Sequence, residues 1–188
     1  MLTADRTTPP LIGYYVRRFY GGRRRQRLLD YLHEDGGRFV RTLKGGKFMG
    51  KWISKRRRLA LYLRDGLACV WCGVGIEDGA QLSLDHLRCR CAGGGHECSN
   101  LVTSCTLCNN RRGERSLEEF AAAVAGYLDV SPSQIIDHIE NTRRHPVDID
   151  AAGKLIERRG SVAAALDDAV GTRLGEAPPP SRQSESAH

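Results

Sequence analysis

Two pairs of cysteines, each with two residues between its members, constrain this chain more than any other feature. The first pair is Cys69 and Cys72 and the second is Cys105 and Cys108, with 32 residues between the pairs. Two thiolates at this spacing chelate one side of a tetrahedral zinc ion, and a second pair completes its coordination. We therefore expect one structural zinc on these four cysteines. The alternative is that some of them are buried apolar thiols.

The remaining cysteines and the N-terminus favour metal ligation over disulfides. Seven cysteines is an odd number, and residues 1–22 lack the apolar core and cleavage site of a secretory signal. The sequence contains no run of 18 apolar residues that would span a membrane. We expect a soluble, cytoplasmic protein that does not act at a membrane. In so small a domain, zinc would supply folding energy that the core cannot.

Positive charge is concentrated in the first third of the chain. Residues 1–64 contain 17 Lys and Arg against 4 Asp and Glu, a balance of +13, and residues 65–188 contain 12 against 18, a balance of −6. The two balances sum to the net charge of +7. A basic segment of this strength indicates a polyanionic partner, with nucleic acid first. A solvated surface or a basic arm without a partner is the alternative.

Composition divides the chain into four parts. Residues 1–48 form a basic, partly disordered N-terminal arm, and a new segment opens at 49, where 49–116 make up a compact zinc-stabilised core. A helical region follows over 117–170. The tail over 171–188 has no apolar periodicity and is expected to be disordered.

Helix-start signals recur along the core and the helical region. Ser116 with Glu119 forms one capping box, and Ser131 with Gln134 forms another, with Pro132 at the first helical position. Ser54 is a further N-cap candidate. We expect helices over 54–64, 116–128, 131–145, 148–159 and 161–170.

The segment between the two cysteine pairs carries its own chemistry. The alternating stretch LSLDHL predicts a strand that ends in Asp85 and His86. A carboxylate beside a histidine is a common start for hydrolysis, because one can hold a metal while the other accepts a proton from water. By itself such a pair is weak, since it is more often a surface coincidence.

Several separated motifs around this pair occur in one particular order. Asp85–His86 is followed by Gly93–Gly94, by Asn100–Leu101–Val102, and by Cys105-x-x-Cys108–Asn109 at the start of a basic segment. Residues 64–73, RDGLACVWCG, precede them. In this order the sequence resembles the HNH endonuclease family over about residues 52–116. The resemblance implies an α+β fold with a ββα-metal core, in which a hairpin packs on a helix around one catalytic divalent ion.

The resemblance also implies roles for individual residues. His86 would be the general base that activates water, and Asn100 would bond the loop backbone and orient that base. Asp85 and Asn109 would hold the catalytic ion, and two oxygen ligands suit Mg²⁺ or Mn²⁺ better than zinc. Arg111, Arg112 and Arg115 would then grip phosphate, with a solvated helix face as the alternative.

These implications lead to one function and one rival. We expect a metal-dependent endonuclease that hydrolyses DNA phosphodiester bonds, with double-stranded DNA as partner and no small-molecule substrate. The products would carry 5′-phosphate and 3′-hydroxyl ends. The rival is a zinc-stabilised nucleic-acid-binding protein without catalysis. The target sequence, the oligomeric state and the choice between a nick and a double-strand cut are open at this level.

The loop after His86 departs from the family pattern. The family usually has a proline three residues after the histidine and small polar residues before the glycines, whereas this chain has cysteines there. Together with His96 they form C-x-C-x4-H-x-C. Either they bind a second zinc, or they are variation within the family, or they take part in redox chemistry or a disulfide. The residues concerned are Cys89, Cys91, His96 and Cys98.

Overall fold

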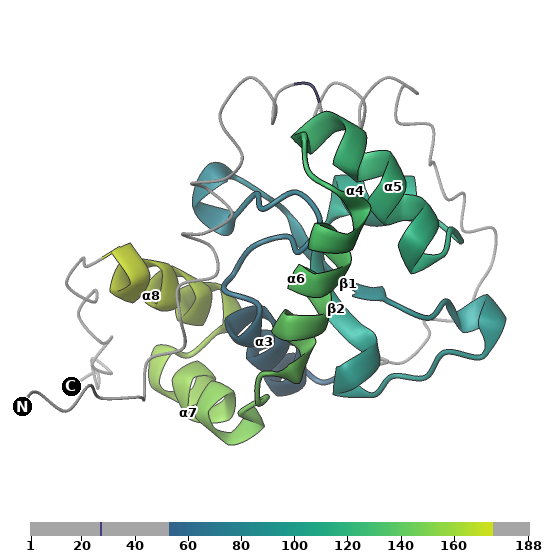
Figure 1. The fold of residues 1–188 in the computed structure, drawn as a ribbon. Helices are drawn as coiled ribbons and strands as arrows, with labels where there is room; N and C mark the ends of the chain where they lie inside the picture. The colour runs from purple at the N-terminus through teal and green to yellow at the C-terminus, as the bar shows by residue number, and fades with distance from the viewer. Residues whose placement is uncertain (1–26, 28–52, 175–188) are drawn as a thin grey trace, which may run out of the picture.

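The computed structural model describes Arg27 and residues 53–174 (Figure 1). This part has mixed α and β structure, with six α-helices and one two-stranded sheet, as the predicted class requires. The expected basic arm over 1–48, the segment start at Met49 and the tail beyond Leu174 lie outside the described residues. Among the helices of the described part, none combines the length and apolar character needed to cross a membrane.

A hairpin and the helix that follows it form the centre of the fold. Strands β1 (Leu82–His86) and β2 (Leu101–Cys105) are antiparallel, with Leu82 opposite Cys105 and His86 opposite Leu101. Helix α4 (Thr106–Arg112) begins directly after β2 and packs on both strands. The predicted strand therefore ends where expected, and the loop over residues 87–100 connects the two strands.

The outer edge of β2 is satisfied by the segment that leads into the first cysteine pair. Helix α3 (Lys55–Arg64) begins at the predicted cap Ser54 and ends beside Asp65. The Thr103 amide donates to Asp65 Oδ2 at 2.6 Å, and the Val70 amide donates to the Thr103 carbonyl at 3.0 Å. Buried polar backbone is thus paired on both sides of β2, which fixes the cysteine segment beside the hairpin.

Two helices cover the hairpin on the side of the cysteines. Helix α5 (Leu117–Leu128) and helix α6 (Pro132–Arg144) both begin with the predicted capping boxes, at Ser116 and Ser131. They pack against each other, and α6 also contacts β2, which it overlies in Figure 1. Their buried faces complete one core cluster with the cysteines, to which Phe120, Val124, Leu128, Ile135 and Ile139 contribute.

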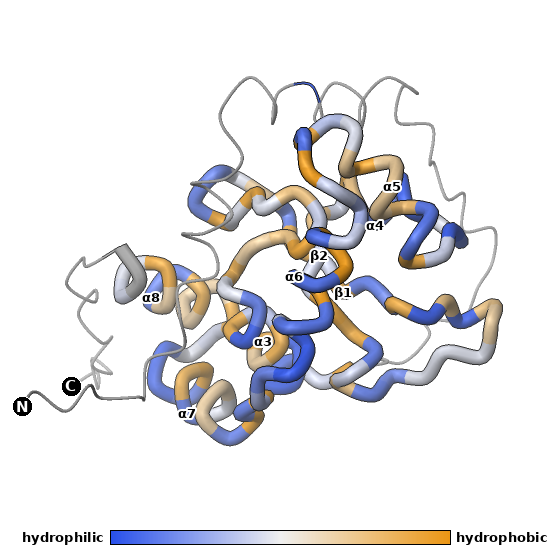
Figure 2. Tube along the Cα trace, in the orientation of Figure 1, coloured by the Kyte–Doolittle hydropathy of each residue, from blue (hydrophilic) through white to orange (hydrophobic). Residues whose placement is uncertain are grey.

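The last two helices form a second layer around α3. Helix α7 (Ile149–Arg159) packs on α3 and on α8 (Val162–Leu174), and hydrophobic and hydrophilic residues alternate along α7 in Figure 2. Asp148 caps α7 and Gly160 ends it. The predicted end near residue 170 was wrong, because α8 continues through Gly171 to Leu174. Gly171 is buried, so packing stabilises helix where a glycine favours a break.

Candidate functional site

The four cysteines of the two pairs converge on one point in the interior. Their sulfur atoms all lie within 4.8 Å of one another and all four residues are buried. Four ligands placed about 2.3 Å from a tetrahedral zinc ion lie about 3.8 Å apart. Cys72 Sγ and Cys105 Sγ are 3.8 Å apart. The predicted cysteine cluster is therefore confirmed as a site whose geometry fits a metal ion such as zinc.

Local backbone structure explains how the two pairs are presented. The first pair lies on a tight turn in which the Gly73 amide donates to the Cys69 carbonyl at 2.8 Å. Gly73 has a φ of 71°, which a glycine adopts without strain. The second pair begins α4, where Cys105 is the N-cap and its sulfur accepts from the Cys108 amide at 3.4 Å. A turn and a helix start thus each deliver two sulfurs.

The thiols differ in acidity even without an ion between them. Burial disfavours the Cys69 thiolate, but hydrogen bonds with Cys105, Cys108 and Cys72 outweigh burial and place its pKa well below the usual value. Hydrogen bonding to Cys105 raises the pKa of Cys72 and of Cys108 well above the usual value. A metal ion bound at this cluster would take the place of the thiol protons.

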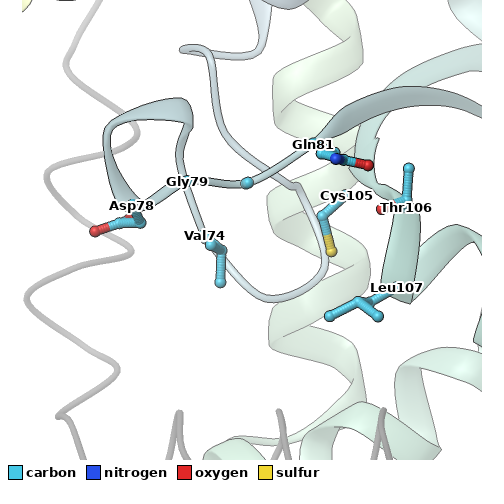
Figure 3. Close-up of a pocket in the computed structure, with 8 residues that line it drawn as sticks. Val74, Asp78, Gly79, Gln81, Cys105, Thr106 and Leu107 are labelled. Carbon is cyan, nitrogen blue, oxygen red and sulfur yellow. The ribbon is translucent and has the colours of Figure 1, made fainter. Parts of the chain in front are cut away.

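A cavity of about 330 Å³ lies next to this cluster (Figure 3). Val74, Gln81, Cys105 and Leu107 are among its lining residues. The cavity thus gives access to the cysteine side of the hairpin. Neither Asp85 nor His86, at the C-terminal end of β1, lines the cavity.

The second set of candidate ligands does not converge. Cys89 and Cys91 form a disulfide, and the Cys98 sulfur accepts from Arg57 Nε at 3.2 Å. His96 instead contacts His86. Among residues 53–174, the cluster of Cys69 and its three partners is the single group of three or more histidine, cysteine or acidic side chains close enough to hold a metal. The possible second zinc is therefore not supported, and the disulfide alternative is the arrangement found.

Asn100 joins the two ends of the long loop between the strands. Its Oδ1 accepts from the Arg88 amide at 2.8 Å, and its Nδ2 donates to the carbonyls of Arg88 at 3.2 Å and Gly95 at 2.9 Å. Gly94 is buried there, and a Cβ on it would lie 1.9 Å from the Arg88 carbonyl oxygen. The loop path therefore requires a glycine at 94 and a side-chain amide at 100.

His86 is the last residue of β1, directly before this loop, and is half-buried. Its Nε2 lies 2.9 Å from His96 Nδ1. Burial lowers the pKa of His86, and the neighbouring His96, Arg90 and Arg112 lower it further. At neutral pH the imidazole is therefore uncharged, the form that can accept a proton.

The Asp85 side chain lies on the face of β1 opposite to that of His86 and points into the protein. Only 5% of the residue is exposed, and its two carboxylate oxygens accept from Trp71 Nε1 at 3.1 Å and from Arg112 Nη1 at 2.7 Å. Burial raises the pKa of Asp85, and the charge of Arg112 opposes that rise. Trp71 also packs edge-to-face on Phe120 at 4.9 Å, which connects the cysteine turn, the carboxylate and α5.

Asn109 lies across from β1 on the first turn of α4. Its Nδ2 donates to Ser83 Oγ at 3.0 Å and to the Leu84 carbonyl at 3.4 Å. Ser83 and Asp85 share one face of β1, because side chains alternate along a strand. Asn109 and Asp85 thus come from facing elements, which places two oxygen-bearing side chains along one interface.

The three arginines expected to grip phosphate have different environments. Arg112 is 2% exposed and donates to the carbonyls of His86 and Leu87 as well as to Asp85. That expectation was wrong for Arg112, because its guanidinium closes the end of β1 inside the protein. Arg111 is half-buried and Arg115 is exposed.

Three relationships at this site were not anticipated from the sequence. They are the ion pair of Arg112 with Asp85, the hydrogen bond of Trp71 to that carboxylate, and the contact of His96 with His86. Asn109 and Arg112 are three residues apart, which places both on one face of the helix. This spacing was a usable signal for the ion pair of Arg112 with Asp85.

Comparison with known proteins adds no match: the chain matches no protein-family model, no curated protein sequence and no solved structure. The geometry described above is therefore the basis for the functional argument.

Proposed function

We propose that this protein is a metal-dependent endonuclease of the HNH type that hydrolyses DNA phosphodiester bonds. The observation that carries the proposal is the arrangement of β1, β2 and α4. His86 ends the first strand, Asn100 closes the loop beside it, and Asn109 on the helix faces the strand that carries Asp85. The sequence resemblance assigns chemistry to these same four residues, which come from β1, from the end of the loop and from α4.

In this proposal His86 accepts the proton of the attacking water. Its burial keeps the imidazole neutral, and a neutral imidazole is a competent base near pH 7. Asn100 contributes by holding the loop, since its three hydrogen bonds fix the backbone on both sides of the glycine run. Both residues belong to the same polypeptide, so the proposed base and the residue that orders its loop need no second subunit.

The donor set at Asp85 and Asn109 fits a hard divalent cation in chemical type. A carboxylate oxygen and an amide oxygen are ligands that Mg²⁺ or Mn²⁺ accepts, and a bound ion would stabilise the charge that builds on the scissile phosphate. Asn109 donates through its nitrogen to β1, so its oxygen is the atom that would act as ligand. Asp85 would have to share its carboxylate between the ion and Arg112.

The distribution of charge supports DNA as the substrate. The chain carries a net charge of +7, and residues 1–64 hold 17 of its 29 Lys and Arg. Within the described residues, α3 begins with the basic run Lys55 to Arg58. Arg57 of this run donates to the His96 carbonyl in the loop over residues 87–100, at 2.5 Å. Basic side chains thus approach the proposed site from the segment that holds most of the positive charge.

One observation favours the rival, a zinc-stabilised nucleic-acid-binding protein without catalysis. Both oxygens of Asp85 already accept hydrogen bonds, from Trp71 and from Arg112. A buried carboxylate satisfied in this way has a structural function that needs no ion. The two candidates therefore differ in whether Asp85 also binds a cation.

Incubation of supercoiled plasmid with the protein and Mg²⁺ or Mn²⁺ tests the proposal. We expect relaxed and linear products that carry 5′-phosphate ends, and no products when the divalent ion is withheld from zinc-loaded protein. Retention of the plasmid on the protein in a mobility shift, without cleavage under any of these ions, would instead establish the binding protein.

A further inference from the structure

Three side chains of the loop beside β1 form a continuous contact chain. His86 Nε2 lies 2.9 Å from His96 Nδ1, and the other ring nitrogen of His96, Nε2, contacts Arg90 Nη1. The two imidazole rings have centroids 5.1 Å apart and are tilted by 53°. His96 therefore lies between the proposed base and a guanidinium.

The direction of each hydrogen bond in this chain follows from the chemistry of arginine. A guanidinium donates and never accepts, so His96 Nε2 must carry a lone pair. Neutral His96 then carries its proton on Nδ1 and donates it to His86 Nε2. His86 Nε2 is consequently an acceptor, and the proton of neutral His86 is on Nδ1.

We propose that His96 is a positioning residue that holds His86 in the tautomer with a proton on Nδ1 and a lone pair on Nε2. Arg90 in turn sets the tautomer of His96. The inference about tautomers stands on geometry alone, whereas its importance for hydrolysis rests on the function proposed above. Nε2 is then the atom that accepts the proton once a water replaces His96 at its lone pair.

Hydrogen bonds to the loop backbone and a disulfide hold His96 and Arg90 in place. Arg57 Nη2 donates to the His96 carbonyl at 2.5 Å, and Asn100 Nδ2 donates to the preceding Gly95 carbonyl at 2.9 Å. Arg90 begins a short 3-10 turn (Arg90–Ala92) and is flanked by the disulfide between Cys89 and Cys91. The unusual cysteines of this loop thus constrain the turn that presents Arg90.

Nuclear magnetic resonance of ¹⁵N-histidine-labelled protein reads the tautomer without any requirement for activity. In the wild type we expect the His86 Nδ1 signal of a protonated nitrogen and the Nε2 signal of an unprotonated one. His96→Ala should mix or reverse this pattern. His96→Asn should keep it, because the asparagine amide nitrogen takes the place of Nδ1–H. A proton on Nε2 of His86 in the wild type, or an unchanged pattern in His96→Ala, overturns the inference.

Cleavage kinetics test whether the tautomer matters for hydrolysis. His96→Ala should change kcat by roughly 10-fold or more with little change in KM, because it removes both the constraint on the tautomer and the donor that water must displace from Nε2, whereas His96→Asn should keep kcat near the wild-type value. Arg90→Gln should change kcat in the same direction as His96→Ala, whereas Arg88→Gln, the same charge change in the same loop, should not change it. An unchanged kcat in His96→Ala contradicts the functional part. If wild-type protein does not cleave DNA at all, the proposed function fails while the tautomer result is still decided by resonance.

Discussion

Arg112 on α4 and Asp85 on β1 form a buried ion pair, with Arg112 Nη1 and Asp85 Oδ1 2.7 Å apart. The same guanidinium donates to the carbonyls of His86 and Leu87, so one side chain joins the helix to the strand end. The pair makes Asp85 both a structural carboxylate and the proposed ligand of a catalytic ion.

Removal of Arg112 should destabilise the fold strongly. Arg112→Ala leaves the Asp85 carboxylate buried without its cation, and loss of one partner of a buried pair costs about 3–5 kcal/mol. Denaturant unfolding measures the difference. Arg115→Ala, an exposed arginine three residues on, should change the free energy of unfolding by less than about 0.5 kcal/mol. Equal effects of the two substitutions would show that the ion pair does not hold the helix to the strand.

The four-cysteine cluster should contain one zinc ion per chain, and its removal should unfold the domain. The ion would contribute folding free energy, since the cluster lies in the middle of one core cluster. A strong chelator at neutral pH should therefore abolish cooperative thermal unfolding, and Cys108→Ser should behave in the same way. Metal analysis that finds no zinc, together with a melting temperature that a chelator does not alter, would contradict the assignment.

Thiol labelling should separate the seven cysteines into three groups. In folded, zinc-loaded protein only Cys98, which is half-buried and outside the cluster, should react rapidly with an alkylating reagent. Denaturation with a chelator should raise the number labelled to five, and reduction of the disulfide between Cys89 and Cys91 should raise it to seven. Seven labels without reductant would show that the disulfide is absent.

The pH dependence of cleavage should report the lowered pKa of His86. A base acts in its neutral form, and burial shifts the loss of that form to lower pH than the usual value of about 6.5. In terms of sign, the folded protein binds this proton less readily than the unfolded chain does. kcat/KM should therefore stay high as pH falls to about 6.5 and decline only below it. A decline centred well above pH 7 would exclude His86 as the group that controls the acidic limb.

Two glycine substitutions should act on different properties: one should impair cleavage, and the other should stabilise the fold. Gly94→Ala places a methyl group against the Arg88 carbonyl and Asn100, so the loop must move and cleavage should fall by about 100-fold, as expected for a misplacement of about 1 Å. Gly126 lies on the exposed face of α5, where a Cβ would meet no atom within 4 Å, so Gly126→Ala should raise the free energy of unfolding by about 0.5–1 kcal/mol. Full activity in Gly94→Ala would mean that the loop path is unimportant for cleavage.

Local signals in the sequence were sufficient for much of the fold. Capping residues act within one helical turn, so Ser116 and Ser131 predicted the starts of α5 and α6. Cysteine spacing predicted the cluster, because chelation requires close pairs. The α8 end was missed because burial of Gly171 depends on tertiary packing, which no local rule contains.

For the candidate site, the sequence named candidate residues but not the contacts between them. Asp85, His86, Asn100 and Asn109 were identified by motif order. The position of His96 beside His86 depends on the path of the loop over 87–100, which Gly94 and Asn100 determine through contacts between its two ends. Arg112 was expected at the surface, and only the packing of α4 on β1 places it against Asp85.

The most direct test of the central claim is cleavage of an end-labelled DNA duplex by zinc-loaded wild type, His86→Ala and the control His145→Ala, each in saturating Mn²⁺. The account predicts that wild type and His145→Ala cleave at similar rates, and that His86→Ala is slower by at least about 100-fold although its zinc content and melting temperature are unchanged. Cleavage by His86→Ala at the wild-type rate would contradict the account.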